Sequence, residues 1–144
     1  EASLTSQEAD GLATFRTKCA GCHPEPLFTD EGFHNIGLPV DNTLNDEGRM
    51  HITLDPADSL KFRTPTLRNV ALSGPYMHDG RFTTLQQCMD FFTDGVQAGP
   101  TLDTLMTPDT GIPLTPQEKS DLIAFMGTLT DMSFIQDPKF KEQH

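Results

Sequence analysis

Several residue types and patterns are scarce in this chain of 144 residues. It contains no tryptophan, one tyrosine and three cysteines, so the cysteines give no basis for a disulfide framework. Apolar runs are only a few residues long, which excludes a transmembrane segment, and no signal peptide is visible. Basic side chains number 10 against 21 acidic ones, and the net charge of −11 argues against binding to nucleic acid.

Length and composition predict one small domain. Hydrophobic residues make up only 35% of the chain, and no repeat, low-complexity tract or linker marks a boundary. Residues 1–144 are therefore expected to form a single domain. Glycine and proline, with 11 of each, predict long irregular connections between short helices.

The most informative segment is Cys-Ala-Gly-Cys-His at residues 19–23. This pattern is typical of covalent haem c attachment, in which Cys19 and Cys22 form thioethers and His23 supplies an imidazole to the iron. A redox Cys-x-x-Cys of the thioredoxin kind would lie near a βαβ pattern, which is not visible. A zinc site needs further ligands, but Cys88 is isolated and no closely spaced pair of histidines exists. We therefore predict one covalent haem c.

Capping patterns predict three helices, over residues 5–18, over 84–95 and from residue 115 onward. A threonine followed by proline predicts another short helix over 64–71. Residues 24–63 are rich in glycine and proline and are expected to form a long loop with one short helical turn. The predicted fold is all-α, a cytochrome c-like domain with long loops around one covalent haem.

Three further segments resemble a known family: Phe-His-Asn-Ile-Gly at 33–37, Phe-Arg-Thr-Pro-Thr-Leu-Arg-Asn at 62–69 and Pro-Tyr-Met-His-Asp-Gly at 75–80. They are similar to the C-terminal haem domain of bacterial dihaem cytochrome c peroxidases and MauG-type enzymes. The resemblance implies a haem that passes electrons, while peroxide reacts at a separate N-terminal haem. This chain resembles only the second half and lacks the tryptophan that the family has between its haems. The resemblance therefore argues against peroxidase activity of this chain alone.

The second axial ligand of the iron is where the sequence departs from this family. Counting forward from the segment at 75–80, Phe92 stands where the family has methionine or tyrosine, and phenylalanine cannot ligate iron. Counting backward from the last helix, Met106 falls near the usual methionine position. We therefore favour Met106, and Met77, Met89 or an open or water-bound site stay as alternatives.

Three histidines, His34, His51 and His78, are further alternatives for the second iron ligand, but those within the family segments look structural. The family also binds calcium between its domains. The matching positions here, Ser73 and Pro75, offer no carboxylate, so no tight calcium site is expected in this chain alone.

Other polar groups are expected to support the haem. Arg63 and Arg68 are candidate partners of the haem propionates, because a guanidinium pairs with a carboxylate in bidentate fashion. The carbonyl of Pro24 or Pro26 is expected to accept a hydrogen bond from the ring of His23, which would fix the imidazole.

These features favour a monohaem c-type cytochrome that transfers electrons. Its acidic charge predicts a redox partner protein with a basic docking patch. The alternative is the C-terminal part or a subunit of a dihaem peroxidase or MauG-like oxidase, which would be an enzyme only with a second haem domain. A third hypothesis is a five-coordinate haem that binds small ligands. No catalytic side chain is predicted, and because thioether attachment takes place outside the cytoplasmic membrane, we expect a periplasmic or otherwise exported protein.

Overall fold

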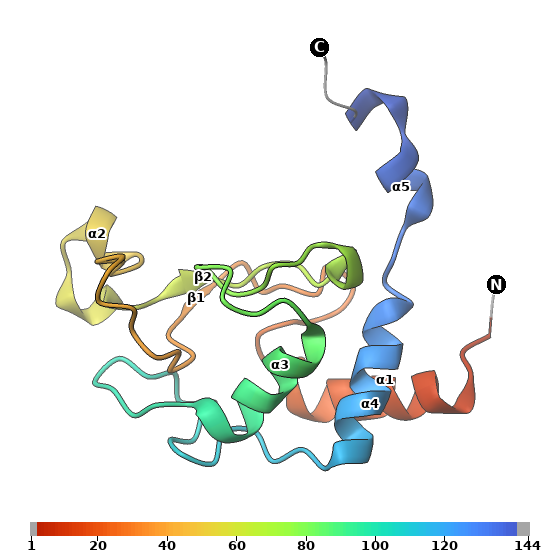
Figure 1. Ribbon diagram of the computed structural model, residues 1–144, viewed down its shortest axis with the longest axis horizontal. Coiled ribbons are helices and arrows are strands. Elements are labelled where there is room, and N and C mark those ends of the chain that lie inside the picture. The colour runs from red at the N-terminus through yellow and green to blue at the C-terminus, as the bar shows by residue number, and fades with distance from the viewer. Residues whose placement is uncertain (1–2, 141–144) are drawn as a thin grey trace.

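The structure, a computed structural model, describes residues 3–140 and is mostly helical (Figure 1). The α-helices are α1 Ser6–Lys18, α2 Met50–Thr53, α3 Leu85–Asp90, α4 Pro116–Gly127 and α5 Met132–Gln136. The strands are β1 Phe33–His34 and β2 Phe62–Arg63. Short 3-10 helices are η1 Pro56–Asp58, η2 Val70–Leu72 and η4 Pro138–Phe140, and η3 Phe91–Gly95 is a π-helix. None of the helices in this part of the chain is long and apolar enough to cross a membrane.

The two long helices begin at the predicted capping boxes. At α1 the Thr5 hydroxyl accepts a hydrogen bond from the N–H of Glu8 (3.3 Å), and the Glu8 carboxylate accepts one from the N–H of Thr5 (2.7 Å). Thr115 and Glu118 do the same at α4, over 3.2 and 2.8 Å. Each box satisfies N–H groups that lack a partner within the helix, which fixes where the helix starts.

Helices α1 and α4 cross in close contact (Figure 1). Gly11 allows this approach, because a Cβ at that position would overlap the carbonyl oxygen of Asp121. Beside it, Phe15 and Leu122 are each only 1% exposed, and the rings of Phe15 and Phe125 lie 5.2 Å apart. This apolar contact is the centre of the core.

Helix α3 begins at the third predicted capping box, where Thr84 and Gln87 exchange hydrogen bonds. Cys88 and Met89 point into the core and are buried. The helical run continues to Gly95, as predicted, but its last turn widens into the π-helix η3.

The prediction of a helix over residues 64–71 is wrong, since only η2, at the end of this segment, is helical. Its N–H groups bond to another part of the chain: Thr64 donates to the carbonyl of Gly32 (2.9 Å) and Leu67 to that of Phe28 (3.3 Å). In addition, β1 and β2 pair as an antiparallel two-stranded sheet, so the fold is mostly helical and not all-α. The short helical turn expected within 24–63 is present as α2.

Helix α5 follows α4 and projects away from the rest of the molecule (Figure 1). Its Phe134 ring lies 4.7 Å from the ring of Phe140, yet both side chains are more than half exposed. The two rings therefore cover each other rather than any part of the core.

Candidate functional site

A cavity of about 750 Å³ opens between the α1–α4 crossing, α3 and the loops that connect them. Its walls are largely apolar and include Phe15, Leu122 and Met126 of the core. Cys19, Cys22 and His23 also line it. A cavity of this size with few polar groups is typical of a site for a large apolar cofactor.

The haem motif is positioned by the end of α1. The N–H of Cys19 still donates to the carbonyl of Phe15 (2.8 Å), and the N–H of His23 donates to the carbonyl of Cys19 (3.1 Å). The chain thus leaves the helix in a tight turn that brings both cysteines and the histidine to one wall. Gly21 lies inside this turn, where a Cβ would come 2.9 Å from the Leu105 side chain.

His23 is held in the protonation state that iron ligation requires. Its Nδ1 lies 2.9 Å from the carbonyl oxygen of Phe28. Because a carbonyl oxygen only accepts, Nδ1 carries the proton and Nε2 has the free lone pair. Burial lowers the pKa of His23, which favours the neutral imidazole. The acceptor is therefore Phe28, and the prediction of Pro24 or Pro26 is wrong.

The cysteines have the properties of neutral thiols. Burial raises the pKa of Cys19 to about 11, and burial together with the nearby Asp103 and Asp30 raises that of Cys22 to about 11. Redox-active Cys-x-x-Cys pairs need the opposite shift, toward the thiolate. Within residues 3–140, no group of three or more His, Cys, Asp or Glu side chains is placed to hold a metal ion. Two cysteines followed by a histidine with a free Nε2, on the wall of an apolar cavity, fit the donor set of a haem c.

Four methionines line the cavity: Met77, Met89, Met106 and Met126 of α4. Met106 is 9% exposed and packs with Phe91 and Val96 in a second apolar cluster. Met89 lies on α3 within the main core, and Met77 contacts both clusters. The choice of Met106 as the second iron ligand stays a prediction.

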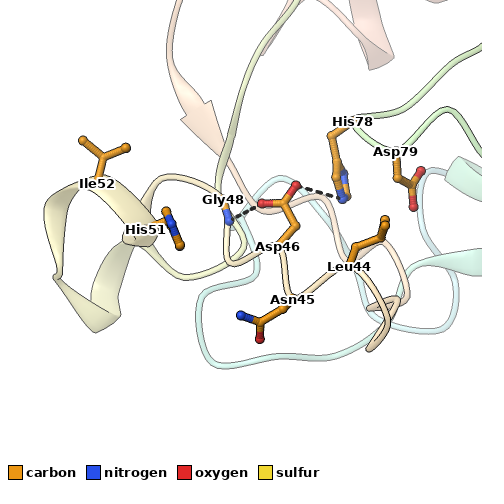
Figure 2. Close-up of a pocket in the computed structure, with 8 residues that line it drawn as sticks. All are labelled: Leu44, Asn45, Asp46, Gly48, His51, Ile52, His78 and Asp79. Carbon is orange, nitrogen blue, oxygen red and sulfur yellow. Dashed lines mark hydrogen bonds and ion pairs between the residues drawn. The ribbon is translucent and has the colours of Figure 1, made fainter.

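The three histidines considered as iron ligands lie in different parts of the structure. His34 lines the cavity, whereas His51 lines only a shallow groove on the outside, beside α2 (Figure 2). His78 borders both, with its ring stacked on Phe62 at 3.7 Å and its Nε2 4.0 Å from Asp46. Of these three histidines, His34 and His78 line the cavity together with His23, and His51 does not.

The two arginines predicted to bind propionates lie in different places. Arg63 lines the cavity, and its guanidinium is 3.3 Å from the carboxylate of Glu31. Arg68 is not among the lining residues and donates a hydrogen bond to the carbonyl of Pro26 (2.8 Å). Arg63 is thus placed for a propionate contact, and such a contact for either arginine stays a prediction.

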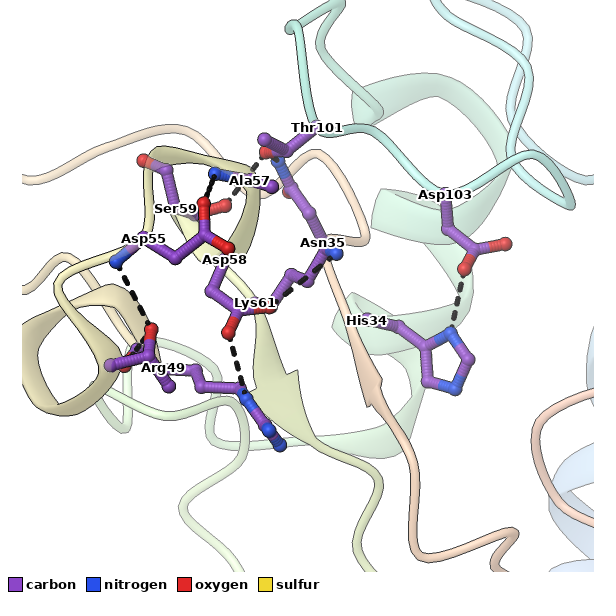
Figure 3. Close-up of polar contacts among 11 residues, drawn as sticks. His34, Asn35, Arg49, Asp55, Ala57, Asp58, Ser59, Lys61, Thr101 and Asp103 are labelled. Carbon is purple, nitrogen blue, oxygen red and sulfur yellow. Dashed lines mark hydrogen bonds and ion pairs between the residues drawn. The ribbon is translucent and has the colours of Figure 1, made fainter.

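Sequence reasoning missed a charged cluster at the cavity wall. The ring of His34 lies between the carboxylates of Asp30 and Asp103, at 2.7 and 2.6 Å (Figure 3 shows the Asp103 contact). Burial disfavours the charged forms, but hydrogen bonds within the cluster and from its neighbours outweigh burial: the pKa of His34 is raised, and the pKa values of Asp30 and Asp103 are lowered. No pattern in the sequence links residues 69 positions apart.

Comparison with known proteins points in one direction. No protein-family model matches the sequence. The chain is 34% identical to the cytochrome-c peroxidase IdrP1 of Pseudomonas sp. (strain SCT), over 89% of this chain and 41% of that protein. It is 36% identical to the methylamine utilization protein MauG of Methylorubrum extorquens, over 90% of this chain and 36% of that protein. The chain thus spans less than half the length of these curated relatives.

Solved structures give the same result. The crystal structure of a MauG-like protein associated with microbial copper homeostasis superposes with a TM-score of 0.81 at 36% identity, covering 97% of this chain and 51% of that one. The Y463M variant of the diheme peroxidase BthA from Burkholderia thailandensis gives 0.76 at 28% identity, covering 99% and 47%. By sequence and by fold, the chain belongs to the cytochrome c peroxidase and MauG family, in which it corresponds to the C-terminal haem domain.

Proposed function

We propose that this chain is the electron-transferring haem c domain of a dihaem peroxidase or MauG-like protein. The observation that carries the proposal is His23, with Nδ1 bonded to Phe28 and Nε2 free, next to Cys19 and Cys22 on the wall of a large apolar cavity. The names of the relatives, cytochrome-c peroxidase and diheme peroxidase, support haem c as the cofactor. When bound, the haem supplies one-electron chemistry at its iron.

Each residue of the site has a separate task in this proposal. Cys19 and Cys22 hold the haem through thioethers, and His23 is the first iron ligand. Met106 is the second ligand, because its thioether is buried against the cavity on a loop near the motif. The apolar walls keep water away and, with a methionine ligand, favour a high reduction potential.

The comparisons favour a part of a dihaem protein over the independent monohaem carrier that the sequence first suggested. Curated relatives are peroxidases and MauG proteins more than twice as long as the matched segment. On this proposal the reaction with substrate takes place at a second haem domain. The chain alone should therefore show no peroxide turnover, and turnover should appear when a second haem domain is supplied.

The ligand assignment is tested by absorption spectra of the haem-loaded protein. Ferric wild type should show the weak band near the red end of the spectrum that reports sulfur–iron bonding. Met106→Ala should lose it and bind carbon monoxide rapidly when reduced, while Met77→Ala and Met89→Ala should keep it. If the band survives in Met106→Ala, this ligand assignment is wrong.

We also propose an extracytoplasmic location, because thioethers to haem form outside the cytoplasmic membrane, and a docking partner with a basic surface. The net charge of −11 supports electrostatic attraction to such a partner. The second-order rate of electron exchange with a basic redox protein should then fall as salt is added. A rate that does not change with salt would argue against this kind of partner.

A further inference from the structure

The ring of His34 bridges two carboxylates at the cavity wall. Its Nδ1 lies 2.6 Å from Asp103 Oδ2, and its Nε2 lies 2.7 Å from Asp30 Oδ2. Carboxylate oxygens accept hydrogen bonds, so both ring nitrogens donate and the ring is a cation. The side chain is only 20% exposed, so these charge-assisted contacts are partly shielded from water.

Asp103 organises the loop that carries Met106. One of its carboxylate oxygens accepts the N–H of Leu105 (2.8 Å), while the other faces His34. Its own carbonyl accepts the N–H of Met106 (3.0 Å). The position of this single residue therefore helps to set the backbone of the loop up to Met106.

Asp30 connects the other side of the bridge to the haem motif. Its N–H donates to the carbonyl of Cys22 (3.0 Å), and its second carboxylate oxygen accepts the N–H of Gly32 (2.8 Å). His34 thus links a segment fixed to Cys22 with the segment that bears Met106.

Asn35, the next residue after His34, makes further hydrogen bonds to the segment that leads to Met106. Asn35 is 4% exposed, and its carbonyl accepts the N–H of Asp103 (2.9 Å). Its side-chain amide donates to the Thr101 hydroxyl (2.9 Å), which in turn donates to the carbonyl of Ser59 (2.7 Å; Figure 3). The segment 33–37 therefore acts as the scaffold of the loop.

We propose that His34 is a positioning residue for Met106. By holding Asp103 against Asp30, it keeps the Met106 loop at a fixed place relative to Cys22 and His23, so the thioether is preorganised for the iron. This inference rests on the proposed function, since it takes Met106 as the second ligand. In other proteins, removing a group that orients a metal ligand lowers the metal affinity by about 10–100-fold.

The test compares haem-loaded His34→Gln and Asp103→Asn with His51→Gln, an exposed histidine in the outer groove of Figure 2. Glutamine in place of His34 can bridge only with a neutral amide. The Asp103→Asn side chain would keep an acceptor for the N–H of Leu105 but lose the charge.

Both bridge variants should lose most of the sulfur–iron band, lower the reduction potential and speed carbon monoxide binding by about tenfold or more. The His51 variant should match wild type, and the double bridge variant should be no worse than either single one, because the same link is broken.

Circular dichroism of each variant tests whether the helices still fold, since the two long helices α1 and α4 contain none of the three bridge residues. If His34→Gln does not fold, Asp103→Asn alone must show the loss of the band with a native helical signal. A band kept in the bridge variants but lost in Met106→Ala would overturn the positioning role and leave the ligand assignment intact. A band kept in Met106→Ala would overturn both.

Discussion

The ion pair between Lys18 and Glu118 joins the end of α1 to the beginning of α4. The Lys18 ammonium lies 2.7 Å from one carboxylate oxygen of Glu118, and the other oxygen accepts the N–H of Thr115. The hydrogen bond from Lys18, followed by that from Thr115, lowers the pKa of Glu118 from 4.5 to about 2. Since the folded-state pKa is the lower one, this carboxylate stabilises the fold above its unfolded pKa.

We expect that stabilisation to be lost as the pH falls from 4.5 toward about 2. Glu118→Gln should lower the thermal unfolding midpoint at pH 7, and the gap to wild type should close over this acidic range. Glu8→Gln is the matched control, because Glu8 also closes a capping box but has no ion pair among residues 3–140. A gap that stays constant down to pH 2 would show that the charge of Glu118 does not contribute.

At the proposed haem motif, the sequence pattern predicts the residues that attach and ligate the haem, but it does not predict the group that holds the His23 ring. The five consecutive residues at 19–23 identify the cysteines and His23 because the attachment pattern is local. The acceptor for the His23 ring depends on how the following turn folds. Phe28 has a φ of 54° and donates its N–H to Pro24, so its own carbonyl points at the ring. Spacing alone cannot predict such a turn.

Close packing of α1 on α4 depends on Gly11. A methyl group there would overlap the Asp121 carbonyl and come 2.8 Å from Cβ of Phe125, both on the partner helix. Alanine would favour the isolated helix by about 1 kcal/mol. The overlap should outweigh this gain, since overpacking a tight contact costs about 1–3 kcal/mol and the backbone of α4 cannot rotate away as a side chain can.

Gly11→Ala should therefore lower the free energy of unfolding measured with denaturant. Gly127→Ala is the control in the other helix, because a Cβ there meets no atom within 4 Å. That variant should be as stable as wild type or slightly more stable. Equal stability of the two variants would mean that the helices are not packed as closely as described.

The starts of α1, α3 and α4 could be predicted because their signals are local: a threonine at each cap and an acidic residue or glutamine three positions on. The elements that escaped prediction are short or depend on distant partners. A strand of two residues, such as β1, shows no alternation to detect. The segment 64–71 has a start signal for a helix, but its N–H groups bond to residues 28 and 32 instead.

For the chain as a whole, the loops between α1 and α4 carry the contacts that assemble the site. Asn35 pairs with Leu102, and His34 with Asp103, across about half the sequence. Such pairings need coordinates, because neither periodicity nor composition marks them. On the proposed function, the exposed rings of Phe134 in α5 and Phe140 in η4 would lie beside a second haem domain.

The most direct measurement is the mass and thiol content of the purified protein after unfolding in acid and organic solvent. The account predicts that one haem stays attached to the chain and that Cys88 is the only thiol that reacts. A Cys19→Ser/Cys22→Ser variant should lose the colour under the same treatment. If the colour of the wild type is extracted and all three cysteines react, no haem c is bound and the proposed function is wrong.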